Sequence, residues 1–355
     1  MMHEDDAWRL GYFDAGEAPE YAIMRLNQER FRAFQEQNSG KLKNHFYITV
    51  VPKTLDLLEC CLTFLPRDLN LFLILNGLNK WEQDFIEARY RHIPQFAVET
   101  NDSIMYARIL DLLVENNDSN FGILDQECFV LNPNFFRRLR FHGGEFAITP
   151  FVTSNKAAQL TFPRTYWLFF NLQVIKRIRD KYRISFKRCW SIPPHLEEHL
   201  ATLKLGYGNF PHESLDYFDD FQLIWAMAIY DGLTFRRTPG RSLFGWPKYR
   251  IAHVGAGHLY LTEEFRDRMI ENLRSYETLR QLDREILEAA AFSYYVHMIL
   301  LENTESEELR QAYLPFFSAY GTSRNLLQTF GSIMYPRRVE EMDGVIREMR
   351  RRKKS

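Results

Sequence analysis

The sequence predicts an α/β protein with a mainly parallel sheet flanked by helices, followed by a helical C-terminal region. Up to Leu131, short β-branched and aromatic runs alternate with helical periodicity, which is typical of a parallel sheet with helices on both faces. The pattern then becomes aromatic-rich and less regular, and from Thr262 onward it is almost wholly helical. With 46% apolar and 15% aromatic residues, the 355-residue chain can bury a large core.

Turn and cap residues separate the expected elements. Ser39-Gly40 ends a polar helix, Thr54 is placed to cap the next helix, Pro66 ends that helix, and Asn76-Gly77 breaks the second apolar run. The expected helices are residues 20–38, 55–65, 80–90, 103–115 and 221–230. The expected strands are residues 45–51, 69–75, 95–98, 121–124 and 234–237.

Charge and cysteine content limit the classes of partner. The 45 Lys+Arg residues and 46 Asp+Glu residues nearly cancel, so we expect no nucleic-acid partner. The four cysteines lack metal-site spacing, which favours a reducing cytoplasm. We expect neither a signal peptide nor a membrane-spanning segment. The basic run at residues 350–354 could bind the anionic inner face of a membrane peripherally, or could be a frayed, soluble C-terminus.

An acidic triplet, Asp125-Gln126-Glu127, directly follows the strand expected at 121–124. Open parallel sheets bind ligands outside the carboxyl ends of their strands. Two carboxylates one residue apart, at the exit of an extended segment, can bind one divalent cation that bridges the phosphates of a nucleoside diphosphate. Such a cation would stabilise the charge that builds on the leaving phosphate during sugar transfer. An isolated triplet of this kind is also common in helix caps and solvated turns.

Residues 121–133, around Asp125 and Glu127, resemble the D-x-D segment of GT-A glycosyltransferases. The likeness extends to four further segments: residues 46–52 with Pro52, residues 73–77 with Asn76, residues 217–223 with Asp219-Asp220, and residues 251–258 with His253. The first two are similar to the family's nucleotide-binding strands. The third resembles the motif near which inverting members keep their base, and the fourth resembles the segment that supplies a metal ligand in some members.

The resemblance implies a GT-A-like, Rossmann-like fold and a metal-dependent, hexose-type glycosyltransferase. It would transfer a sugar from a UDP- or GDP-sugar to a hydroxyl of a glycan, a lipid-linked sugar or a protein. Asp125 would lie near the donor ribose or the Mn²⁺ or Mg²⁺ ion, with Glu127 and His253 on the metal. The further candidates for binding the donor are Pro52, Asn76, Arg108 and Lys248. The implied domains are an N-terminal helical extension (1–44), a GT-A-like domain (45–261) with a donor half (45–131) and an acceptor half (132–261), and a C-terminal helical region (262–355).

Several assignments have alternatives. Asp219 or Asp220 could be the general base for an inverting transfer, or could cap the helix at 221–230. His253 could instead be structural. The aromatic run at 167–170 is expected in the core, with Asn171 as an acceptor contact. The whole chain could also be a non-catalytic nucleotide-sugar or carbohydrate binding protein on the same fold, or an interaction scaffold acting through its helical C-terminal third.

Overall fold

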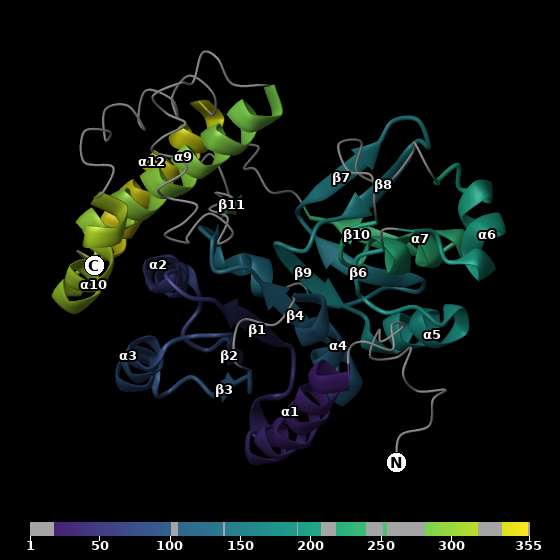
Figure 1. Cartoon of the computed structure of the whole chain (residues 1–355), viewed down its shortest axis with the longest axis horizontal. Helices are drawn as coiled ribbons and strands as arrows, with labels where there is room; N and C mark the ends of the chain where they lie inside the picture. Colours follow the sequence, from purple (N-terminus) through teal and green to yellow (C-terminus); the bar gives the residue numbers. More distant parts are fainter. Residues whose placement is uncertain are drawn as a thin grey trace. The chain divides into compact units, whose positions relative to one another are not determined.

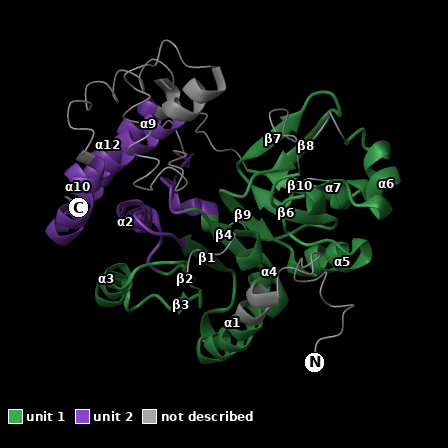
Figure 2. Ribbon diagram, viewed as in Figure 1, with its two compact units in different colours: residues 1–49, 68–125, 136–239 green, residues 50–67, 126–135, 240–355 purple. Residues whose placement is uncertain are grey.

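The computed structural model describes residues 18–100, 106–137, 139–189, 191–206, 218–238, 251–253, 281–318 and 336–353. The chain divides into two compact units that interleave along the sequence (Figure 2): unit 1 comprises residues 1–49, 68–125 and 136–239, and unit 2 comprises residues 50–67, 126–135 and 240–355. Among the described helices, none combines the length and the apolar character needed to cross a bilayer.

A seven-stranded, mostly parallel sheet forms the centre of unit 1 (Figure 1), with the strand order β10-β6-β9-β4-β1-β2-β3. β1 pairs in parallel with β4, β2 with β3 and β6 with β10, while β9 runs antiparallel between β4 and β6. The strands are β1 (His45–Val50), β2 (Leu71–Leu75), β3 (Gln95–Ala97), β4 (Phe121–Leu124), β6 (Glu145–Thr149), β9 (Trp167–Phe170) and β10 (Thr234–Arg237). A separate antiparallel hairpin consists of β7 (Val152–Asn155) and β8 (Leu160–Pro163). The mixed α/β class and the mostly parallel sheet are thereby confirmed.

Helices of unit 1 cover the sheet and bury one continuous core. Phe31 and Phe34 of the first helix pack against Phe96 and Phe72 on the sheet, and Trp225 stacks on Phe146 at 5.2 Å between ring centroids. The helices are α1 (Ala18–Gln37), α3 (Lys80–Tyr90), α4 (Tyr106–Asn116), α5 (Leu172–Tyr182), α6 (Glu197–Thr202) and α7 (Gln222–Tyr230), with short 3₁₀ turns at η2 (Ser39–Lys41) and η4 (Pro194–Leu196). A further 3₁₀ turn, η3 (Pro133–Arg137), begins in unit 2 and ends in unit 1.

The expected elements of the first half coincide with α1 to β4 within a few residues, because strong local signals bound them. A capping box starts α3, in which Asn79 accepts from the Glu82 N–H and Glu82 accepts from the Asn79 N–H. The stretch expected to be less regular differs, since it contains β6 to β9 and α5. All four residues of β9 are buried, so this strand lacks the apolar–polar alternation that marks a half-exposed strand.

Unit 2 joins two short segments of the first half of the chain to the C-terminal helices. Its helices are α2 (Leu55–Phe64), α9 (Gln281–Asn303), α10 (Glu307–Ser318) and α12 (Pro336–Lys353), and its strands β5 (Cys128–Phe129) and β11 (Ala252–His253) form an antiparallel pair. Helices α2 and α9 are joined by a buried hydrogen bond of 2.7 Å between Asp56 Oδ2 and His297 Nδ1. The helical pattern expected after residue 262 is thus present in the described residues.

Candidate functional site

The strand order of unit 1 reverses between β1 and β4, because β2 and β3 lie on one side of β1 and β4 lies on the other. At such a switch point, the loops that follow neighbouring strands diverge and leave room for a ligand at the carboxyl edge. Asp125 is the first residue after β4, and its N–H donates to the Tyr166 carbonyl at 2.9 Å. The sheet therefore places the Asp125 carboxylate at its ligand-binding edge.

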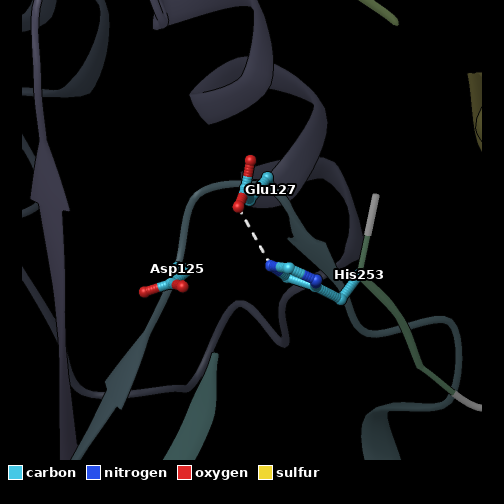
Figure 3. A group of neighbouring side chains, drawn as sticks. All are labelled: Asp125, Glu127 and His253. Carbon is cyan, nitrogen blue, oxygen red and sulfur yellow. Dashed lines mark hydrogen bonds and ion pairs between the residues drawn. The ribbon is translucent and has the colours of Figure 1, made fainter. Parts of the chain in front are cut away.

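Asp125, Glu127 and His253 each offer one ligand atom, and these three atoms lie within 4.8 Å of one another (Figure 3). Asp125 and Glu127 flank Gln126 in one short loop, so the loop itself keeps them close. Glu127 Oε1 lies 2.9 Å from His253 Nε2, and both side chains are largely buried, at 16% and 10% exposed. His253 is held by strand pairing, since it lies opposite Cys128 in the β5–β11 ladder. The structure thus brings together the three residues that the sequence predicts as metal ligands.

Two carboxylates and one imidazole suit a divalent cation that accepts mixed oxygen and nitrogen ligands, such as Mn²⁺. In this structure Glu127 Oε1 and His253 Nε2 hydrogen-bond to each other. A bound ion would take the place of that hydrogen bond and be held by the same two side chains. The chemistry and the spacing of the donor set therefore fit a metal.

Asp219 and Asp220 precede α7 at the same edge of the sheet. This follows because α7 leads into β10, which runs parallel to β6. Asp219 accepts two hydrogen bonds from Arg188, at 3.2 and 2.9 Å. Burial, and to a lesser degree the neighbouring charge of Asp219, raise the pKa of Asp220 to about 6, against the opposing effect of Arg188. The capping alternative is wrong for these two side chains, since the N-cap residue of α7 is Phe221 and no side chain caps the helix.

Tyr106 belongs to this edge but was missed by the sequence reasoning. It is the first described residue of α4, the helix that precedes β4. Burial raises its pKa well above the ordinary value, and the negative charges of Asp125 and Asp220 add to the rise. Tyr106 therefore lies within electrostatic reach of both carboxylates and carries a protonated hydroxyl. Its position in the first turn of a helix at the carboxyl edge was the available signal.

The remaining donor-binding candidates lie in different environments. Asn76 directly follows β2 and is buried, and Pro52 follows β1 and is partly buried. Arg108 is 1% exposed inside α4, where its charge opposes the burial that raises the pKa of Asp111 to about 7. Lys248 lies outside the described residues.

The aromatic run at 167–170 lies in the core as expected, since all of β9 is buried. Asn171 donates to the Glu145 carbonyl at 3.0 Å, so its amide is engaged in joining the end of β9 to β6. Tyr166, whose carbonyl accepts from the Asp125 N–H, is partly exposed, as are Phe151 and Arg164. Phe151 and Tyr166 pack edge to face at 5.6 Å, and Arg164 donates to the Tyr166 hydroxyl at 2.6 Å.

Three of the C-terminal cations have partners within the chain. Arg350 donates to Asn303, and Arg351 and Arg352 both donate to Glu348. These described contacts give no support to the alternative in which the basic run binds a membrane.

The fold and the site together define a class: an open, mostly parallel α/β sheet with a carboxylate–histidine group at its ligand-binding edge. Known proteins are similar to parts of this chain. Residues 23–175 match the family model described as the StrH glycosyltransferase N-terminal domain. This segment includes Tyr106, Asp125 and Glu127, whereas Asp219, Asp220 and His253 lie beyond it.

A curated relative and two solved structures are also similar to the chain. The relative is the dTDP-dihydrostreptose--streptidine-6-phosphate dihydrostreptosyltransferase of Streptomyces griseus, 34% identical over 84 residues, which cover 24% of this chain and 21% of the relative. The chain thus matches about a fifth of that protein's length. The mannosyltransferase PcManGT from Pyrobaculum calidifontis, in complex with GDP-Man and Mn²⁺, aligns over 97% of both chains with 11% identity and a TM-score of 0.37. The glycosyltransferase GlyE of Streptococcus pneumoniae TIGR4 aligns over 56% of this chain and 67% of its own, with 11% identity and a TM-score of 0.28.

Proposed function

We propose that this protein is a metal-dependent glycosyltransferase of the GT-A type. It transfers a hexose-type sugar from a nucleoside-diphosphate sugar to a hydroxyl acceptor. The observation that carries the proposal is the convergence of Asp125, Glu127 and His253 within 4.8 Å, directly after a strand at the switch point of the sheet. The family match over residues 23–175 supports the same reaction class.

The metal would be held by Glu127 and His253, with Asp125 on the metal or on the donor ribose. When bound, Mn²⁺ or Mg²⁺ neutralises the negative charge that builds on the diphosphate as the glycosidic bond breaks. The relative from Streptomyces griseus is named for a dTDP-linked donor. We therefore include dTDP-sugars beside UDP- and GDP-sugars among the proposed donors.

Asp220 is the proposed general base. Its carboxylate accepts the proton of the acceptor hydroxyl while that oxygen attacks the anomeric carbon, and the diphosphate leaves with the bonding electrons. Attack from the side opposite the leaving group inverts the anomeric centre. The raised pKa of Asp220 suits this role, because a carboxylate with a pKa of about 6 is a stronger base than an ordinary one and is still ionised at neutral pH.

The proposed acceptor is a glycan, a lipid-linked sugar or a protein hydroxyl, and its site includes the edge-to-face pair Phe151 and Tyr166. Aromatic faces suit the apolar faces of sugar rings, and Arg164 beside Tyr166 offers hydrogen-bond donors to acceptor oxygens. The cytoplasm is kept as the proposed location, since Cys60, Cys61, Cys128 and Cys189 form no disulfide with one another in the described structure.

A thermal-shift panel of UDP-, GDP-, CMP- and dTDP-sugars, each with and without Mn²⁺, tests the proposal. A ligand that binds only the native state at about 100 times its Kd stabilises that state by about 2.7 kcal/mol. We expect one nucleotide to raise the Tm, and to do so only with Mn²⁺. The Asp125→Asn and Glu127→Gln variants should lose the shift and the hydrolysis of the donor.

Asp118→Asn is the matched control, because Asp118 is an exposed carboxylate before β4, at the opposite edge of the sheet. It should keep the full Mn²⁺-dependent shift. A shift that persists in both site variants would show that the carboxylates do not bind the metal–donor complex, and the proposed site would be wrong.

A further inference from the structure

Arg352, near the end of α12, makes contacts with three separate segments of unit 2. Its Nε donates to Glu348 at 3.0 Å, one Nη donates to the Thr63 carbonyl at 3.3 Å, and the other donates to the Leu131 carbonyl at 2.9 Å. The guanidinium also lies over the Phe64 ring, 4.9 Å from its centroid. A planar group with donors on several sides can join three acceptors in this way, whereas an ammonium cannot reproduce the geometry.

Two of the acceptors are backbone carbonyls, one at the end of α2 and one just beyond β5. Thr63 lies in the last turn of α2, where helical carbonyls lack intrahelical donors and a cation is electrostatically favoured. Leu131 lies just beyond β5. Glu348, which orients Arg352, is only 6% exposed, and its hydrogen bonds from Arg351 and then Arg352 lower its pKa. The Arg352 guanidinium is therefore held in place by Glu348 of α12 and donates to both α2 and the end of the β5 segment.

The two segments that Arg352 joins also contact each other directly. The Cys61 thiol donates to the Cys128 carbonyl at 3.5 Å, and the Phe64 and Phe129 rings pack at 6.0 Å. Helix α2 therefore supports β5 from one side, and Arg352 connects the end of that helix to the end of the β5 segment.

The β5 strand in turn carries two of the proposed metal ligands. Glu127 directly precedes β5, and His253 lies opposite Cys128 in the β5–β11 ladder. The positions of the Glu127 and His253 side chains thus depend on the position of the β5 backbone. Leu131 is four residues from Glu127, which is roughly 13 Å along an extended chain, so Arg352 acts on the ligands only through the backbone.

We propose that Arg352 is a positioning residue for the metal site. By joining α2 to the β5 segment, it holds Glu127 and His253 at the separation that a divalent cation requires. This inference rests on the proposed function, because it assigns a role in the same metal site. It also gives Arg352 of the C-terminal basic run a role inside the protein, which differs from both the membrane contact and the frayed C-terminus considered from the sequence.

Titration of the full-length chain with Mn²⁺, followed by electron paramagnetic resonance of the free ion, tests this role in the Arg352→Gln variant. We expect the Kd for Mn²⁺ to rise about tenfold, which is the lower end of the usual effect of removing a residue that orients metal ligands. Hydrogen exchange without metal should become faster in residues 59–65 and 126–131. The matched control is Arg351→Gln, which removes the same charge from a side chain that is 68% exposed and also bonded to Glu348.

An Mn²⁺ Kd for Arg352→Gln within twofold of the Arg351→Gln value would overturn the role of Arg352, as would unchanged exchange in residues 126–131. If Arg352→Gln does not fold, Arg352→Lys, which keeps the charge but loses the fork of donors, is compared with Arg351→Lys by the same criteria. Absence of Mn²⁺ binding in the wild-type chain would overturn the metal site itself. Wild-type Mn²⁺ binding that the Arg352 variants leave unchanged would overturn only the role of Arg352.

Discussion

Asp220 combines partial burial with a negatively charged neighbour, and both raise its pKa, to about 6. A carboxylate accepts a proton only when it is ionised. The catalytic rate should therefore be highest above pH 6 and should fall as the pH drops through about 6, because Asp220 becomes protonated. The Asp220→Asn variant should lose about 10²- to 10⁴-fold in kcat, the usual contribution of a general base.

Neutralising Asp219 tests the electrostatic part of this explanation. In Asp219→Asn, the charge that raises the pKa of Asp220 is gone while the opposing charge of Arg188 remains, so the pKa of Asp220 falls. The acid limb of the kcat/KM profile should move to lower pH. The measurement is a pH–rate profile for wild type and variant, and an acid limb that stays in place, or moves upward, would exclude Asp220 as the group that titrates.

The sequence suggested Asp125, Glu127 and His253 as candidate ligands because the first two follow an expected strand and all three lie in segments that resemble GT-A motifs. Tyr106 could not be found in the same way, since a tyrosine near the start of an amphipathic helix is usually a core residue. Its significance depends on the charges of Asp125 and Asp220, which lie far from it in sequence and close in space. Arg188 was missed for the same reason, because only the fold brings it to Asp219.

At the scale of elements, the contact between β1 and β4 depends on Gly122. The two strands pair with Phe46 opposite Gly122, and a Cβ added at Gly122 would lie 2.1 Å from the Phe46 ring. The ring also packs against Trp167 and Phe169 at 5.5 and 5.6 Å, so it has no free space to enter. The absence of a side chain at Gly122 thus permits the aromatic layer on this face of the sheet.

Gly122→Ala should lower the free energy of unfolding by about 1–3 kcal/mol, the usual cost of overpacking a core. Urea denaturation followed by circular dichroism measures it. Gly143→Ala is the matched control, because a Cβ there meets nothing within 4 Å, and it should change the free energy by less than about 0.5 kcal/mol. Equal stability of the two variants would contradict the close packing of Phe46 on Gly122.

The elements up to β4 were predictable because Gly, Pro and cap residues mark their ends. The antiparallel β9 was not, since its residues Trp-Leu-Phe-Phe are buried on both faces and show no periodicity. Its place between β4 and β6 depends on long-range pairing rather than on local sequence.

At the scale of the whole molecule, the C-terminal helices were predictable from their periodicity, but their partner was not. Asp56 of α2 and His297 of α9 are 241 residues apart and both are fully buried, and the His297 ring stacks on Phe317 at 4.5 Å. No local pattern links an aspartate in the first half of the chain to a histidine near its end. The stability of variants at this pair therefore measures how strongly α2 and α9 are joined in unit 2.

Removing both partners of this pair should destabilise unit 2 by less than the sum of the two single removals. His297→Leu leaves a buried carboxylate without its partner and should cost about 3–5 kcal/mol. Asp56→Leu leaves an imidazole and should cost less, about 1–3 kcal/mol. The double variant should cost less than the sum, because an apolar pair needs no hydrogen bond. Guanidinium-induced unfolding of the wild type, the two single variants and the double variant measures these costs. A double-variant cost equal to the sum of the single costs would contradict the prediction.

The interleaving of unit 2 has a consequence for biosynthesis. A ribosome adding roughly 5–20 residues per second needs about 12–48 seconds to travel from codon 56 to codon 297. During that interval the nascent α2 exposes its apolar face and its aspartate without their later partners. We therefore expect the sheet of unit 1 to be able to form while translation continues, whereas unit 2 must wait until its last helix has left the exit tunnel.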